Sequence, residues 1–236
     1  MSAPDPRAPL DPALESFIDK WRGRWPEWPV AEIFVPPAQR ALALAWATLL
    51  QELTDAAWGG RDARPGEAKL GWWQEELTGW AAGRRRHPLG QALQRQPATW
   101  ARLAQALDTL PATREPARDA EQAIAALQAF AAAAAEAEQA LFGGTGCAPA
   151  ITLSLLHLHL AHHPDGAVPE ALRAAHGENA PQAWAKALRR RFGARGTPRP
   201  RGVWAALAHA RLAQADPAQP LSPWRTVWAA WRGARG

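Results

Sequence analysis

Two parts of this sequence place acidic side chains at a spacing that could do chemistry. Glu52 and Asp55 are three residues apart, and Glu75 and Glu76 are adjacent within the segment KLGWWQEELTGW (69–80). Carboxylates one helical turn apart share a face, where they can bind magnesium, and magnesium can bind a diphosphate group. The alternative is that these acids face water, opposite a stripe of apolar and tryptophan side chains. The spacing by itself favours the solvated alternative.

Histidines form a second candidate site, at positions 157, 159, 162 and 163. His159 and His163 are four residues apart, a spacing that can bind a metal on one helix face, with Asp165 as a third ligand. No glutamate lies between them as in the metalloprotease pattern. Histidines at the end of an apolar helix also complement its negative end. We therefore favour a helix end or the lining of a polar pocket over a metal site.

Arginine and tryptophan form a third candidate, most densely in the final segment WRTVWAAWRGARG (224–236). Arginine beside aromatic rings can bind phosphates and stack on bases, and an exposed helix of this kind can contact an anionic membrane. Trp224, Trp228 and Trp231 recur at helical spacing, which is more often a sign of packing on a core. We expect core packing, with peripheral membrane contact as the alternative and nucleic acid as the least favoured partner.

Composition limits the classes of protein to consider. The 236 residues carry a net charge of +5, which favours anionic partners, although abundant Arg, Ala, Pro and Trp also suit a GC-rich genome. The single cysteine, Cys147, excludes an intrachain disulfide and fits a reducing compartment. The apolar stretch within 141–164 is shorter than a membrane span. We expect a soluble cytoplasmic protein, with a peripheral position on the inner face of a membrane as an extension of that expectation.

The elements that must position these residues are helices. An apolar stripe predicts a helix over 38–58, and Leu70, Trp73, Leu77 and Trp80 form the buried face of another over 67–83, with Glu75 and Glu76 at its edge. Further helices are predicted over 12–25, from 87, and over 117–142, 148–163, 169–175, 181–192, 203–215 and 222–232. No segment alternates as a strand does. The sequence predicts a flexible tail over 1–12 and one all-α domain over 13–236, with about eight or nine helices.

Uncommon residues agree in order and spacing with a known pattern between positions 34 and 93. They are Phe34, Pro37, Arg40, Lys69, Leu70, Trp73, Glu76, Leu77, His87 and Pro88. In this order they resemble the opening of the squalene/phytoene synthase family, and PLSPWRTVWAAWRGAR (220–235) is similar to the family's C-terminus. The resemblance implies an isoprenoid-synthase-type helical bundle. In active members two aspartate-rich motifs face each other across a cavity and bind magnesium, which binds the isoprenyl diphosphates.

The resemblance also implies which residues would form such a site. Arg40, Gln51 and Lys69 would bind substrate diphosphate, and Glu52 and Asp55 would bind magnesium. The same two acids and Asp165 are the candidate catalytic residues. Diphosphate leaves only when its charge is neutralised, and a carbocation survives only where water is excluded.

The sequence departs from the family at these acidic motifs. The first motif should begin fourteen residues after Arg40, but that window reads TDAAW (54–58), with Asp55 alone and Trp58 at the last aspartate position. Gln51 replaces the arginine before it, and the helix that should carry the second motif offers histidines and a lone Asp165. Both metal sites are therefore incomplete.

We expect a degenerate member that needs no cofactor, has lost prenyl transfer, and binds an isoprenoid, another lipid or a protein partner. The run Gln51-Glu52-Leu53 is similar to the non-catalytic relatives, which include assembly factors of mitochondrial respiratory complex I. One alternative is an active magnesium-dependent transferase that condenses isoprenyl diphosphates in a rearranged site, which requires Asp55 and Asp165 to face one water-excluded cavity. A third is a basic protein that binds a membrane surface or nucleic acid.

Overall fold

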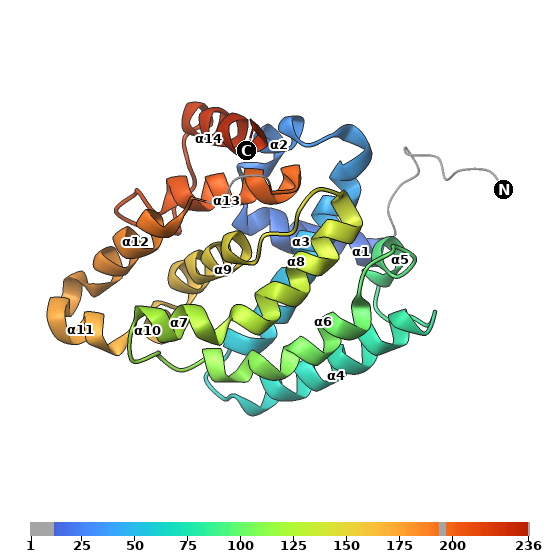
Figure 1. Cartoon of the computed structure of the whole chain (residues 1–236), viewed down its shortest axis with the longest axis horizontal. Coiled ribbons are helices and arrows are strands. Elements are labelled where there is room, and N and C mark those ends of the chain that lie inside the picture. The colour runs from blue at the N-terminus through green and yellow to red at the C-terminus, as the bar shows by residue number, and fades with distance from the viewer. Residues whose placement is uncertain (1–11, 194–196, 236) are drawn as a thin grey trace.

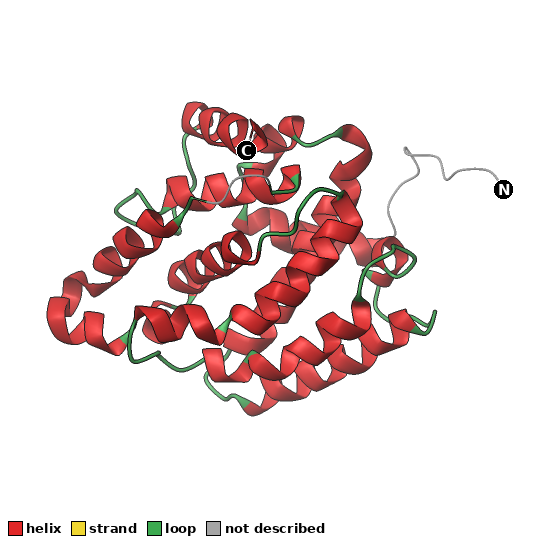
Figure 2. Cartoon of the chain, viewed as in Figure 1, coloured by secondary structure: helices red, strands yellow, loops and turns green. Residues whose placement is uncertain are grey.

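The computed structural model describes residues 12–193 and 197–235, and within these ranges the chain is all-α without a β-strand (Figures 1 and 2). The predicted all-α class is confirmed. The chain divides into more helices than the eight or nine predicted, because several predicted helices are interrupted. Most of the predicted tail lies outside the described residues, and Pro12 already belongs to the first helix.

The helices follow one another with short connections. The α-helices are α1 (Pro12–Arg24), α2 (Trp28–Ala31), α3 (Pro37–Trp58), α4 (Arg64–Ala81), α5 (Gly90–Leu93), α6 (Trp100–Ala106), α7 (Ala120–Ala126), α8 (Gln128–Phe142), α9 (Ala148–His162), α10 (Pro164–Ala167), α11 (Glu170–His176), α12 (Ala180–Arg191), α13 (Arg199–Arg211) and α14 (Pro223–Arg235). Single 3-10 turns are η1 (Glu32–Phe34), η2 (Leu107–Thr109), η3 (Pro111–Thr113) and η4 (Gly177–Asn179).

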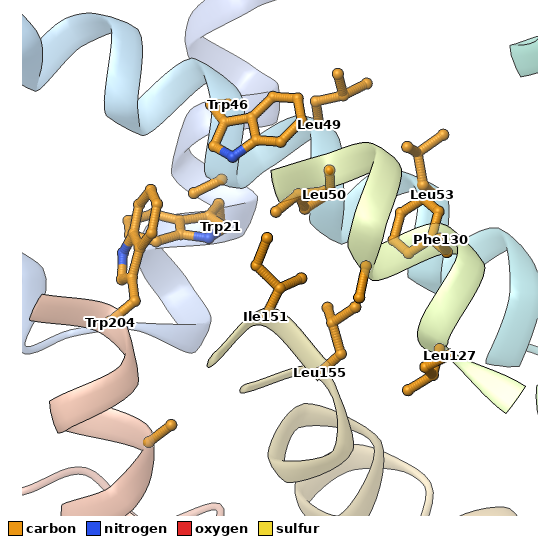
Figure 3. Close-up of a cluster of buried hydrophobic side chains, with 14 of the residues drawn as sticks. Trp21, Trp46, Leu49, Leu50, Leu53, Leu127, Phe130, Ile151, Leu155 and Trp204 are labelled. Carbon is orange, nitrogen blue, oxygen red and sulfur yellow. The ribbon is translucent and has the colours of Figure 1, made fainter. Parts of the chain in front are cut away.

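The long helix α3 runs through the interior and is buried along nearly its whole length from Ala43 to Trp58. It begins with Pro37 at its first turn, where the missing N–H costs no hydrogen bond, and ends before Gly59. Helices α1 and α4 pack against it, and α8 and α9 pack against each other beside it. Their side chains meet in one hydrophobic cluster (Figure 3). The labelled members are Trp21, Trp46, Leu49, Leu50, Leu53, Leu127, Phe130, Ile151, Leu155 and Trp204.

Two predicted helices are shorter than expected. The helix predicted over 117–142 begins at Ala120, because the Asp119 side chain accepts a hydrogen bond from the backbone N–H of Gln122 (2.8 Å) and caps it. It is then interrupted at Leu127, between α7 and α8. The segment after His87 forms α5 and α6 instead of one helix, and Pro97, which lacks an N–H for a helical hydrogen bond, lies between them.

Helix α14 contradicts the expectation that its tryptophans pack on the core. Trp224 is 85% exposed and Trp228 is 59% exposed, while the buried residues of this helix are Thr226, Ala229 and Ala230. Small side chains let α14 approach α13 closely, so that a Cβ added at Gly233 would lie 2.3 Å from the carbonyl oxygen of Gly202. The small residues of α14 hold the helix against α13, and the large side chains of Trp224 and Trp228 remain exposed to solvent.

Two buried ion pairs tie α13 to distant parts of the chain. Glu138 of α8 accepts hydrogen bonds from the Arg201 guanidinium (3.1 Å from Nε) and from the Trp46 indole N–H (2.7 Å). Glu27, just before α2, accepts hydrogen bonds from Arg211 (2.8 Å) and from the backbone N–H of Leu221 (2.8 Å). A charge in the interior is tolerated only with such partners, so these pairs fix how the helices are oriented.

Removing one member of such a pair tests this role. We expect Glu138→Ala to lower the free energy of unfolding by about 3–5 kcal/mol, because it leaves the Arg201 charge buried and unpaired. The double variant Glu138→Leu/Arg201→Met, which removes both charges, should regain most of that loss. Urea unfolding followed by circular dichroism measures both, and equal losses in the two variants would contradict the interpretation.

Candidate functional site

The acids Glu52 and Asp55 of α3 lie in a cluster of opposite charges. Lys20 of α1 donates to Glu52 Oε1 (2.7 Å), and Lys69 of α4 donates to Glu52 Oε2 (2.8 Å). Asp55 Oδ1 accepts from Arg24 (2.6 Å), and Asp55 Oδ2 lies 3.0 Å from the Lys20 ammonium. Every carboxylate oxygen of the two acids therefore has a cationic partner from a neighbouring helix.

This cluster keeps Glu52 ionised although the side chain is buried. Burial by itself would raise the pKa of Glu52, but the hydrogen bonds from Lys20 and Lys69 lower it below its ordinary value of 4.5. Burial would likewise lower the pKa of Lys20, and its hydrogen bonds to Glu52 and Asp55 raise it above 10.5. Glu52 and Lys20 therefore stabilise each other in their charged forms.

The residues present do not fit the magnesium ion that the resemblance implies. Magnesium needs oxygen ligands in near-octahedral geometry, and here the oxygens of Glu52 and Asp55 face ammonium and guanidinium groups instead. Within residues 12–193 and 197–235, no group of three or more His, Cys, Asp or Glu side chains could hold a metal ion. A magnesium ion would have to displace Lys20, Arg24 and Lys69.

The other predicted site residues lie apart from this cluster. Arg40 is three turns before Glu52 on α3 and donates to the carbonyl oxygens of Val35 (3.0 Å) and Ile33 (3.3 Å), which fixes the turn that leads into the helix. Asp165 is exposed on α10, and its backbone carbonyl accepts a hydrogen bond from Arg173. Asp165 therefore does not lie in the water-excluded cavity that the enzyme alternative requires.

Gln51 is the one predicted site residue that is buried without a partner for its side-chain N–H₂ group within the described chain. It lies on α3 next to Glu52.

The acids of α4 play different roles from those expected. Glu75 is exposed, but Glu76 is buried and accepts hydrogen bonds from the Trp80 indole (2.8 Å) and from the backbone N–H groups of Arg86 (2.7 Å) and His87 (2.8 Å). The expectation that these acids face water is thus correct for Glu75 and wrong for Glu76 and Glu52. Leu70, Trp73, Leu77 and Trp80 are buried as predicted. Glu76 anchors the loop after α4.

Trp58 occupies the position at which the resemblance expects the last aspartate of the first motif. Its ring stacks on His159 of α9, with centroids 4.2 Å apart and planes 12° from parallel, and its indole N–H donates to Thr113 Oγ1 (2.8 Å). The end of α3 therefore meets α9 through an aromatic stack. Neither side chain of this contact is acidic.

A pocket of about 310 Å³ lies beside this stack, between η3, α7, α9 and α10. Buried apolar side chains of Ala123, Leu127, Leu156 and Ala167 line it, together with polar groups of Thr113, Gln122 and His159. Sequence reasoning identified His159 as a pocket-lining candidate and missed the rest. No local signal marks those residues, because four separate elements bring them together.

The histidines of α9 do not form the metal site considered above. His157 and His159 are buried, and the rings of His159 and His163 are 6.1 Å apart. Burial lowers the pKa of His157 and of His159 to about 3, and burial with the nearby Arg24 charge lowers that of His162 to about 4. These side chains are neutral near pH 7, and His159 and His162 lie in the last turn of α9, with His163 directly after it.

Comparison with protein-family models, with curated proteins and with solved structures finds no match for this chain. Among the described helices, none has the length and apolar character needed to cross a bilayer.

The buried histidines predict acid-sensitive stability. Below pH 6.5 the unfolded chain binds more protons than the folded chain, so the free energy of unfolding should fall as the pH decreases from about 6.5 toward 4. His159→Phe keeps the stack on Trp58 but cannot titrate. We expect its loss of stability between about pH 7.5 and pH 5.5 to be smaller than that of the wild type by about 1.4 kcal/mol.

Urea unfolding at the two pH values measures this difference. His176→Gln, at the exposed end of α11, is the matched control and should retain the wild-type pH dependence. If His159→Phe loses as much stability between the two pH values as the wild type and His176→Gln do, then burial does not keep His159 neutral.

Proposed function

We propose that this chain is a non-catalytic protein of the squalene/phytoene synthase type, with an isoprenoid-synthase-like bundle, and that it acts by binding. The observation that carries this proposal is the neutralisation of Glu52 and Asp55 by Lys20, Arg24 and Lys69. A transferase needs free carboxylates there to hold magnesium against the diphosphate. In this chain the same acids hold α1, α3 and α4 together.

The contact between Trp58 and His159 supports the same proposal. In the family pattern, acidic side chains at these helices would face each other across a cavity. Here two stacked rings lie next to Thr113, and this aromatic contact in place of acidic side chains supports the proposal that neither metal nor diphosphate binds there.

The pocket beside the stack supports an isoprenoid or related lipid as the ligand. Its volume lies at the lower end of the range of small-molecule sites, and its walls are apolar with a few polar groups. An isoprenyl chain would lie against Ala123, Leu127 and Leu156, and a polar end could reach Gln122 or His159. A protein partner, the other kind of binding considered from the sequence, stays a prediction.

The loss of catalysis has a direct test. With farnesyl diphosphate and magnesium we expect no diphosphate release above the rate without protein, because Glu52 and Asp55 are not available as metal ligands. A coupled pyrophosphatase assay measures the release. Turnover that Asp55→Ala abolishes and that Asp62→Ala, a change of an exposed acid outside the cluster, leaves intact would overturn the proposal.

Ligand binding has a matched pair of variants on α7. Ala126 lines the pocket, whereas its neighbour Ala125 is exposed and does not. We expect Ala126→Phe to fill the pocket and weaken the binding of farnesol by about tenfold or more, a loss of about 1.4 kcal/mol. Ala125→Phe should bind farnesol as the wild type does.

Isothermal titration calorimetry with farnesol measures these affinities, and circular dichroism confirms that both variants are folded. The absence of farnesol binding to the wild type, or equal weakening in the two variants, would show that this pocket is not the ligand site.

A further inference from the structure

The exposed face of α14 has an unusual composition for the surface of a folded protein. Among the described residues the exposed large hydrophobic side chains are Ile33, Trp224 and Trp228, and all three lie on α14 or on η1, which contacts it. Trp231, half-buried, stacks on Trp228 with ring centroids 5.1 Å apart. Apolar side chains gathered in this way mark an interaction surface.

The tryptophans are directed away from the protein by helical geometry. Positions 224, 228, 231 and 235 recur on one face, whereas the buried Thr226, Ala229 and Ala230 lie on the opposite face against α13. Figure 1 shows α14 at the edge of the molecule, with α13 between it and α9. The exposed tryptophans therefore do not contribute to the core, and the small-residue contact with α13 holds the helix in place without them.

The charge on α14 itself is one-sided, although Glu32 lies on the neighbouring η1. Residues 179–236 contain eleven Lys and Arg residues and a single acid, Asp216, but Arg191, Arg201 and Arg211 of these are in ion pairs. Helix α14 has no acidic residue, and Arg225, Arg232 and Arg235 form no ion pair within the described chain. The Arg235 guanidinium lies over the Trp231 ring, 3.9 Å from its centroid.

We propose that α14 docks this protein on an anionic membrane surface, with Trp224 and Trp228 inserted at the level of the lipid headgroups. Tryptophan favours that region because its ring is apolar and its indole N–H is polar. Arginines beside it bind the phosphates of acidic lipids, and a helix lying in the interface inserts by about 5–10 Å. A single-stranded nucleic acid binds in a cationic groove of a protein. Helix α14 lies at the edge of the molecule, so a flat membrane surface fits it better than a nucleic acid does.

This inference does not depend on the pocket or on the proposed function. The test uses the full chain and vesicles of phosphatidylcholine, with or without about 30% phosphatidylglycerol, in a sedimentation assay. We expect binding to the anionic vesicles only. Trp224→Ala/Trp228→Ala should weaken it by about tenfold or more without unfolding the protein, because both side chains are exposed.

Two matched double variants test whether vesicle binding requires the arginines of α14. Arg225→Gln/Arg232→Gln removes two exposed charges from α14, and Arg84→Gln/Arg85→Gln removes two exposed charges after α4. The first pair should weaken vesicle binding about tenfold or more, and the second should leave it near the wild-type level. Circular dichroism confirms that all variants are folded.

Four results would overturn the proposal. These are no binding to anionic vesicles, equal weakening by the two arginine pairs, a dimer in solution that Trp224→Ala/Trp228→Ala converts to a monomer, and binding to duplex DNA that depends on the same tryptophans more strongly than vesicle binding does. The third would assign the face to a second copy of the chain, and the fourth to nucleic acid.

Discussion

Three of the four buried carboxylates among the described residues are held by cations from helices that are distant in the sequence. Glu138 depends on Arg201, Glu27 on Arg211, and Glu52 on Lys20 and Lys69. An ion in a helical interior is tolerated only when its partner is in place, so each pair requires a particular arrangement of two or three helices. The position of α1, α4 and α13 around α3, α8 and α9 follows from these pairs together with the apolar cluster.

The same requirement accounts for the chemical character of the site. Asp55 and Glu52 lie where the resemblance expects metal ligands, but their oxygens are already bound by Lys20, Arg24 and Lys69. The two features on which the binding proposals rest are the pocket beside His159 and the exposed face of α14. Helices α7 and α10, which line the pocket, lie at another side of the bundle from α14 (Figure 1).

Local pattern was sufficient for α3 and α4, missed the breaks near Asp119, Leu127 and Pro97, and failed where contacts are remote. The helices predicted over 38–58 and 67–83 are observed as Pro37–Trp58 and Arg64–Ala81, because a one-sided apolar stripe is a property of the helix itself. The apolar stripe of α4 places Glu76 at the edge of that helix. The sequence does not show that the loop at 86–87 folds back onto Glu76 and buries it. The helical spacing of Trp224, Trp228 and Trp231 predicts packing on the core, because spacing shows that these side chains share a face but not which face of α14 meets α13.

By itself, the sequence determined the all-α class and the buried face of α4. Only the tertiary structure decided that Asp55 and Glu52 are neutralised, that Trp58 meets His159, and that the α14 tryptophans face outward. The reason is physical. Helix formation and the orientation of one apolar stripe depend on residues three and four apart, whereas ion pairing and close helix packing depend on side chains that are far apart in the chain.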